Sequence, residues 1–200
     1  MEKQANADYP IHELIAKRWS PCGFADRPVS RDDLLSLFEA ARWAPSSYNE
    51  QPWNYLVATK DQRDNFGRML SCLVEPNRDW AQHAPVLVLT VAGLNFTRNG
   101  KPNTAAWHDI GLASASLSLE ATARGLSIHQ MIGILPDRAQ EIYEILEGFQ
   151  VVTGLAIGYA ADPDTLEASI KQRDTAVRQR KRLSEFVFSD RWGTTADFIP

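Results

Sequence analysis

Residues 40–53 of this 200-residue chain have the sequence AARWAPSSYNEQPW. The first of them complete an amphipathic helix that is expected to start after Ser30, because the apolar side chains at 34, 35, 37, 38 and 41 follow helical spacing. Pro45 is expected to stop that helix, and residues 55–59 have the apolar character of a strand. The serines and amides in between therefore form a polar loop with a single charge, held between a helix and a strand.

The composition excludes several classes of protein. Hydrophobic residues make up 44% of the chain and charged residues 23%, as in an ordinary globular protein, and we expect one domain over residues 1–200. The formal net charge of −4 argues against a nucleic-acid partner, which needs a basic face. The longest apolar run, from Pro85, is shorter than the roughly 20 residues that span a bilayer, and the first residues lack a signal-peptide core. We therefore expect a cytoplasmic protein with no membrane partner.

The periodicity predicts an alternation of helices and strands. Helices are expected at about 8–18, 30–45, 61–72, 103–124, 136–146 and 164–180. Strands are expected at 55–59, 85–92 and 151–159, and residues 127–134 are expected to be extended or irregular. The strand at 85–92 has too little alternation to be half exposed, so we place it in the interior of a sheet.

The helix expected at 103–124 contains IGLASASLSL, residues 110–119, without a charge on any face. A helix that is apolar or small all round is buried all round. It is either the central core helix of a monomer or a helix at a subunit interface. One domain of this size rarely surrounds such a helix completely, which favours the interface.

The motifs of several enzyme classes are absent from the sequence. It contains no GxGxxG, GxxxxGK[ST], HExxH or GxSxG, so neither a dinucleotide fingerprint nor a P-loop is present. The four histidines are scattered, and Cys22 and Cys72 lack CxxC spacing. We therefore expect no metal site and no disulfide framework.

Three polar clusters remain as candidates for a binding site. They are the loop at 44–53, the pair Arg18 and Ser20, and the basic residues Arg178, Arg180, Lys181 and Arg182. Arginines bind phosphate with paired hydrogen bonds, and serine and amide side chains bind polar neutral groups, so together the clusters suit an anion and a polar ring. Each also has a purely structural explanation: a surface arginine, serines that cap a helix, and a solvated helix end.

The order of these segments resembles the nitroreductase family of FMN-dependent oxidoreductases. The segments are KRWSPCGF, EAARWAPSSYNEQPW, ATARGLSIHQMIGI, GLAIGYAADPD and RQRKRLSEFVFSDRWG, and the similarity covers about residues 11–193. It implies an α+β, nitroreductase-like three-layer fold, with a mixed central sheet flanked by helices. It also implies an intertwined homodimer with FMN at the subunit interface, in which the tail, about residues 184–200, extends onto the partner.

The resemblance also implies which residues bind the cofactor. The N-terminal phosphate-binding motif is matched by Arg18 and Ser20 and completed by Arg180 and Lys181. The loop that reaches the flavin of the other subunit is matched by Pro45, Ser46, Ser47 and Asn49, with Gln51 in support. The segment beside the isoalloxazine, where an N–H can donate to N5, is matched by Gln130, Met131, Ile132 and Gly133, and Asn77 matches a further contact. No catalytic side chain is implied.

Cys22 departs from the family pattern, which usually has a basic residue at that position near the N1 and O2 edge of the flavin. A cation there stabilises the anionic reduced flavin, so a neutral thiol is expected to lower the reduction potential or weaken binding. Cys22 is either a small filler or a reactive thiol, and the lack of a histidine matched to it favours the filler.

The function implied is an FMN-dependent oxidoreductase. Hydride would pass from NAD(P)H, a transient donor, through flavin N5 to a nitroaromatic, a quinone or a similar small electrophile. The alternatives are a flavoenzyme of the same fold with a different reaction and a flavin-binding or sensory protein with little turnover.

Overall fold

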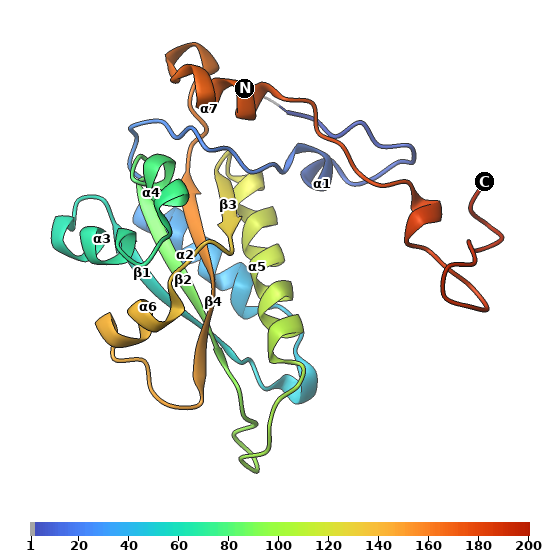
Figure 1. Ribbon diagram of the computed structural model, residues 1–200, viewed down its shortest axis with the longest axis horizontal. Coiled ribbons are helices and arrows are strands. Elements are labelled where there is room, and N and C mark those ends of the chain that lie inside the picture. Colours follow the sequence, from blue (N-terminus) through green and yellow to red (C-terminus); the bar gives the residue numbers. More distant parts are fainter. Residues whose placement is uncertain (1–2) are drawn as a thin grey trace.

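The computed structural model describes residues 3–200 as a sheet with helices on both faces (Figure 1). The strands lie in the order β1-β2-β4-β3. They are β1 (Trp53–Thr59), β2 (Val86–Gly93), β3 (Ser127–Met131) and β4 (Phe149–Gly158). The helices are α1 (Glu13–Lys17), α2 (Arg31–Arg42), α3 (Arg63–Leu70), α4 (Glu75–Ala81), α5 (Ala106–Ala123), α6 (Pro136–Ile142) and α7 (Ala168–Thr175).

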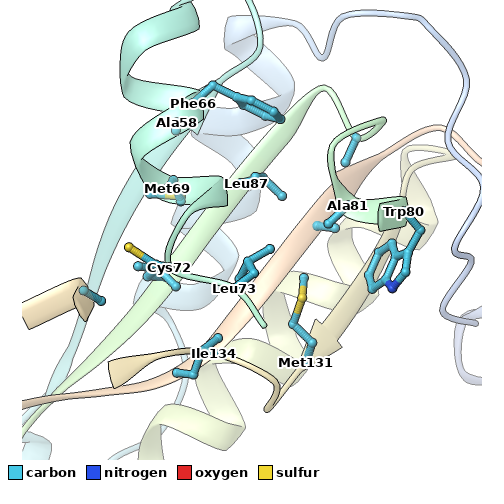
Figure 2. Close-up of a cluster of buried hydrophobic side chains, with 14 of the residues drawn as sticks. Ala58, Phe66, Met69, Cys72, Leu73, Trp80, Ala81, Leu87, Met131 and Ile134 are labelled. Atoms are coloured by element: carbon cyan, nitrogen blue, oxygen red, sulfur yellow. The ribbon is translucent and has the colours of Figure 1, made fainter. Parts of the chain in front are cut away.

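The central strand β2 divides the core into two layers, because its successive side chains point to opposite faces of the sheet. Val86 and Val88 pack with α2 and α5 on one face. Leu87 and Leu89 pack on the other face, under α3, α4 and α6. Figure 2 shows this second layer, which includes Phe66, Met69, Cys72, Leu73, Trp80, Met131 and Ile134. The fold therefore has three layers, and the expected interior position of the strand at 85–92 is confirmed.

The mixed sheet implied by the resemblance is wrong for the single chain, because every neighbouring pair among the described strands is antiparallel. The connection through α3 and α4 explains the first pair. It leaves and re-enters the sheet at the same end, where Thr59 pairs with Val86, so β2 must run opposite to β1.

Several expected elements are confirmed, with shifted ends. Ser30 caps α2 by accepting a hydrogen bond from the Asp33 backbone N–H at 3.0 Å. The helix α4 was not expected, since its seven residues show little periodicity. The polar helix expected at 164–180 is shorter: α7 ends at Thr175, and Ala176 is already extended.

One face of α5 is exposed in the single chain. Trp107, Gly111 and Ala115 are four residues apart along the helix and all lie at the surface, while Ala113 and Leu117 are fully buried. The expectation of a helix buried all round, as in a monomer core, is therefore wrong for one chain.

The C-terminal segment after α7 runs away from the sheet, alongside the segment that carries α1 (Figure 1). Its only helical turn in the described residues is η3 (Leu183–Glu185). The aromatic side chains of Phe186, Trp192 and Phe198 are exposed, the last two by 94% and 78%. Large apolar side chains are thus presented to solvent far from the core. Over residues 3–200, none of the helices is both long and apolar enough to cross a membrane.

Candidate functional site

Arg18 and Ser20 lie directly after α1, where the chain turns toward the sheet. Arg18 is the C-cap residue of the helix, and its Nη1 donates to the Ser20 hydroxyl at 3.3 Å. Ser20 is exposed and Arg18 is half-buried. The two polar side chains therefore point to a common region at the surface.

Positive charge collects around Arg18. Burial, followed by the charges of Arg178 and Arg180, lowers the pKa of Arg18 below its ordinary value, although a guanidinium stays protonated. Among residues 3–200, no carboxylate lies within ion-pair distance of Arg18 or Arg180. A half-buried cation beside other cations, without an acidic partner, favours an anionic ligand.

The other basic residues of the predicted site differ in their roles. Nη1 of Arg178 donates to the backbone carbonyls of Lys3 and Ala16, at 2.7 and 2.8 Å, so this guanidinium binds the chain itself. Arg180 and Lys181 are both exposed, and Arg180 donates to the Gln179 carbonyl. The structure brings Arg180 near Arg18 and leaves Lys181 at the surface after it.

The strand β3 contacts the loop that carries Arg18 and Ser20, because Nδ1 of His129 lies 2.8 Å from the Pro21 carbonyl, and the predicted segment 130–133 follows His129. Gln130 donates from Nε2 to the Ser118 hydroxyl of α5 at 3.0 Å, and Met131 is buried. Ile132 is 86% exposed. Within residues 3–200, the backbone N–H groups of Ile132 and Gly133 donate to no acceptor. Two adjacent donors are thus free at the end of the strand.

Asn77 supports this segment. Its Nδ2 donates to the Gly133 carbonyl at 3.0 Å, and the Val74 backbone N–H donates to the same oxygen at 3.1 Å. A Cβ at Gly133 would clash with the Asn77 amide and with Val74, so only glycine allows this close approach. Asn77 therefore fixes the position of residues 132–133.

The loop at 45–51 has a strained backbone. Tyr48, Asn49 and Gln51 adopt φ values of 55°, 56° and 53°, the left-handed region that residues other than glycine rarely occupy. The Ser46 hydroxyl accepts from the Gln51 backbone N–H at 3.0 Å, and Pro45 and Asn49 are exposed. Such strain persists only where the surroundings fix the backbone, and it is often found at functional sites.

Asp109 holds this loop against the first turn of α5. Its carboxylate is almost fully buried and accepts a hydrogen bond from the Ser47 backbone N–H at 3.0 Å. On the outer side, the Glu50 carboxylate accepts from the Thr97 N–H at 2.7 Å, and the Arg98 guanidinium lies 4.0 Å from the Tyr48 ring centroid. The loop is therefore fixed from α5 and from residues 95–102.

The predicted residues form two separate groups in one chain. In the first group Arg18 contacts Ser20, the Pro21 and Cys22 segment contacts His129 of β3, and Asn77 contacts Gly133 after β3. No hydrogen bond or ion pair of the described residues joins this group to the 45–51 loop. The loop is attached to α5 at Asp109, and Gln130 is attached to α5 at Ser118. These two positions are nine residues apart, so they are separated by about 14 Å along the helix axis and lie half a turn apart around it. Figure 1 shows the cyan loop at the start of α5 and α1 near its other end.

Cys22 is buried beside His129, and both Arg173 and Asp174 lie close enough for their charges to act on it. It is only 3% exposed, and its Sγ lies 3.8 Å from Nδ1 of His129, a neighbour that the sequence did not predict. That nitrogen lies 2.8 Å from the Pro21 carbonyl and is therefore a donor, so it cannot remove the thiol proton. Burial is also the main reason why the pKa of His129 is lowered. Cys22 presents little surface to a ligand.

We expect Cys22 to react slowly with thiol reagents. Burial raises its pKa from 9.0 to about 11, against the opposing charge of Arg173 and with a smaller contribution from Asp174. Roughly a hundredfold less thiolate is therefore present at pH 8 than for an unperturbed cysteine. Labelling of the native protein with a disulfide reagent at pH 8, followed by mass spectrometry, should leave Cys22 unmodified, while the protein in denaturant reacts at once. Rapid native labelling of Cys22 would contradict the filler role.

Two residues of the site, Asp109 and Asp174, were missed by sequence reasoning. Asp109 carries one weak signal, since it is an acidic residue directly before a long uncharged stretch. Asp174 lies in a polar helix among other charged residues and carries none. Among the described residues, no group of histidine, cysteine, aspartate and glutamate side chains could hold a metal ion.

Comparisons with known proteins agree with this architecture. The family model described as Nitroreductase family matches residues 15–159. A solved structure described as an oxidoreductase containing FMN is 33% identical, with a TM-score of 0.88 over 95% of this chain and 96% of that one. The 4-nitrobenzoate reductase of Pseudomonas putida is 23% identical over 82% of this chain and 91% of its own, and the FMN reductase (NAD(P)H) of Bacillus subtilis is 26% identical over 84% and 74%. The three-layer fold implied by the resemblance is confirmed, and the chain belongs to the nitroreductase family.

Proposed function

We propose that this protein is a homodimeric, FMN-dependent NAD(P)H oxidoreductase. The observation that carries the proposal is the half-buried Arg18 guanidinium beside Arg180 and Ser20, which has no carboxylate partner among residues 3–200. The names of the relatives support the chemistry, since they include a reductase of 4-nitrobenzoate, a reductase of FMN and an oxidoreductase that contains FMN.

The residues present fit this cofactor. Its phosphate would be held by Arg18, Ser20, Arg180 and Lys181. Their two guanidiniums, one hydroxyl and one ammonium can all donate hydrogen bonds to phosphate oxygens. The free N–H groups of Ile132 and Gly133 would bind an acceptor atom of the ring system, and Asn77 would keep them in place. The site would be completed by residues of the 45–51 loop, namely Pro45, Ser46, Ser47, Asn49 and Gln51. Cys22, a neutral thiol, would supply no cation to the edge of the ring near it.

The residues of the chain would act by position and charge. FMN, when bound, would supply the redox chemistry for hydride transfer from NAD(P)H to a second substrate. Arg18 and Arg180 would fix the phosphate, and the Ile132 and Gly133 N–H groups would orient the ring against β3. The His129 nitrogen nearest Cys22 already donates to the Pro21 carbonyl, so it would not act as a general base.

The homodimer is proposed because one chain separates the two groups of site residues. The 45–51 loop is attached half a turn and about 14 Å away from the segment at Gln130, so the loop of one subunit would reach the cofactor of the other. The exposed face at Trp107, Gly111 and Ala115 would pack at the interface. The tail, about residues 184–200, would bury its exposed aromatic side chains against the partner.

We propose a nitroaromatic, a quinone or a similar small electrophile as the acceptor, and a cytoplasmic location. The test is the visible spectrum of the purified protein, followed by steady-state oxidation of NADH and NADPH with a nitroarene or a quinone. A yellow protein that bleaches with NAD(P)H and turns over with an acceptor is expected. A protein that stays colourless with added FMN would contradict the proposal, and a yellow protein that never bleaches would favour a flavin-binding role with little turnover.

A further inference from the structure

The side chains of Asp174 and Arg178 both bind the backbone of the N-terminal loop that carries Arg18 and Ser20. The Asp174 carboxylate is only 3% exposed and belongs to the last turn of α7. It accepts hydrogen bonds from the Cys22 N–H at 2.9 and 3.1 Å and from the Gly23 N–H at 2.8 Å. A buried carboxylate is thus fully engaged with two consecutive backbone donors.

Arg178 binds the other end of the same loop. Its guanidinium donates to the Ala16 carbonyl, at the end of α1, and to the Lys3 carbonyl. Lys3 in turn donates from Nζ to the backbone carbonyl of Asp174. The contacts at Ala16 and at Cys22 lie two residues before Arg18 and two residues after Ser20, so the pair of polar side chains is held from both sides.

The chemical types of the two side chains match their tasks. A carboxylate binds backbone N–H donors, and a guanidinium binds carbonyl acceptors, so the charges cannot be exchanged. Residues 16–23 belong to no strand. Their carbonyls contact the sheet side at Pro21, which lies 2.8 Å from Nδ1 of His129, and at Gly23, which accepts from the Ala161 N–H at 3.1 Å. The Ala16 carbonyl also accepts from the Ala5 N–H at 2.9 Å, and to these contacts Asp174 and Arg178 add side-chain hydrogen bonds on both sides of Arg18 and Ser20.

We propose that Asp174 and Arg178 are positioning residues of the anion site: they form a splint that fixes Arg18 and Ser20 and sets Arg180, two residues beyond Arg178, against them. This inference rests on the proposed function only in the identity of the anion, the FMN phosphate. The splint explains why Arg178 is withdrawn from the site although it belongs to the basic run. Fixing the binding groups before the ligand arrives lowers the cost of ordering them on binding.

The test compares FMN with riboflavin, which has the same ring system and lacks the phosphate. In flavin-depleted protein, the ratio of FMN affinity to riboflavin affinity should be at least tenfold lower for D174N than for the wild type, while riboflavin affinity changes less than threefold. R178Q should have the same effect through the other end of the loop. The matched controls are D164N and K171Q, which break an exposed ion pair in the same region and should keep the wild-type preference.

The outcomes separate the splint from general stability and from the proposed function. Folded D174N and R178Q proteins with the wild-type preference would overturn the proposal, and so would failure of both to fold, because these side chains would then support the whole fold. Thermal stabilisation by inorganic phosphate gives the same comparison without flavin. One result would support the splint and contradict the proposed function: phosphate stabilises the wild type but neither variant, and the wild type does not bind FMN.

Discussion

Replacing Arg18 by glutamine is expected to lower the affinity for FMN about a hundredfold, or roughly 2.7 kcal/mol. Glutamine keeps a neutral donor near the position of the arginine Nε and removes the charge and the two Nη donors, so the loss reports the charge-assisted phosphate contact. The effect is large because Arg18 is half-buried, which limits the screening of its charge by solvent. Quenching of flavin fluorescence in titrations of flavin-depleted protein measures it.

The control for this experiment is Arg63→Gln, which removes an exposed arginine at the start of α3, away from α1 in Figure 1. Its FMN affinity should stay within about twofold of the wild type, since a distant surface charge is screened. The salt dependence of FMN binding should also become weaker in R18Q alone. Equal affinity and equal salt dependence in wild type and R18Q would show that the anion site is elsewhere.

The largest effect on stability is expected for Leu117→Ala, with a loss of about 3 kcal/mol in the free energy of unfolding. Leu117 is fully buried at the middle of α5, where it packs with Leu37 and Ala41 of α2 and with Val86 and Val88 of β2. Truncation removes the burial of the side chain and leaves a cavity between helix and sheet. Unfolding in urea, at one fixed protein concentration, measures the difference.

Leu146→Ala is the matched control, because this leucine is 71% exposed in the turn after α6. Its loss should be within about 0.5 kcal/mol, as for other surface substitutions. If Leu117→Ala cost less than about 1 kcal/mol, the packing of α5 between α2 and the sheet would be looser than the structure shows.

Much of the fold follows from local patterns. The cap at Ser30, the uncharged stretch of α5 and the apolar run of β2 each carry a signal within one element, and each is found where the sequence predicts it. The pairing directions of the strands depend on where each connection re-enters the sheet, which no local pattern records. For this reason the antiparallel sheet could not be predicted.

The site was predictable only in part, for the same physical reason. Side chains with a ligand-binding chemistry, such as Arg18 and Ser46, could be chosen from their type and neighbours. The end of α7 could not, because the chain leaves the helix at Ala176 and Arg178 binds carbonyls of Lys3 and Ala16, more than 150 residues away in sequence. The role of Asp174 is likewise defined by a distant backbone.

The attachment of both polar groups to α5 has a consequence for how the protein can change in evolution. Adding one residue to α5 between Asp109 and Ser118 would rotate one attachment point by about 100° relative to the other and shift it by about 1.5 Å. Length variants of this helix should therefore abolish cofactor retention even when they fold. The number of residues between Asp109 and Ser118 therefore sets the distance and the angle between the two attachment points of the site.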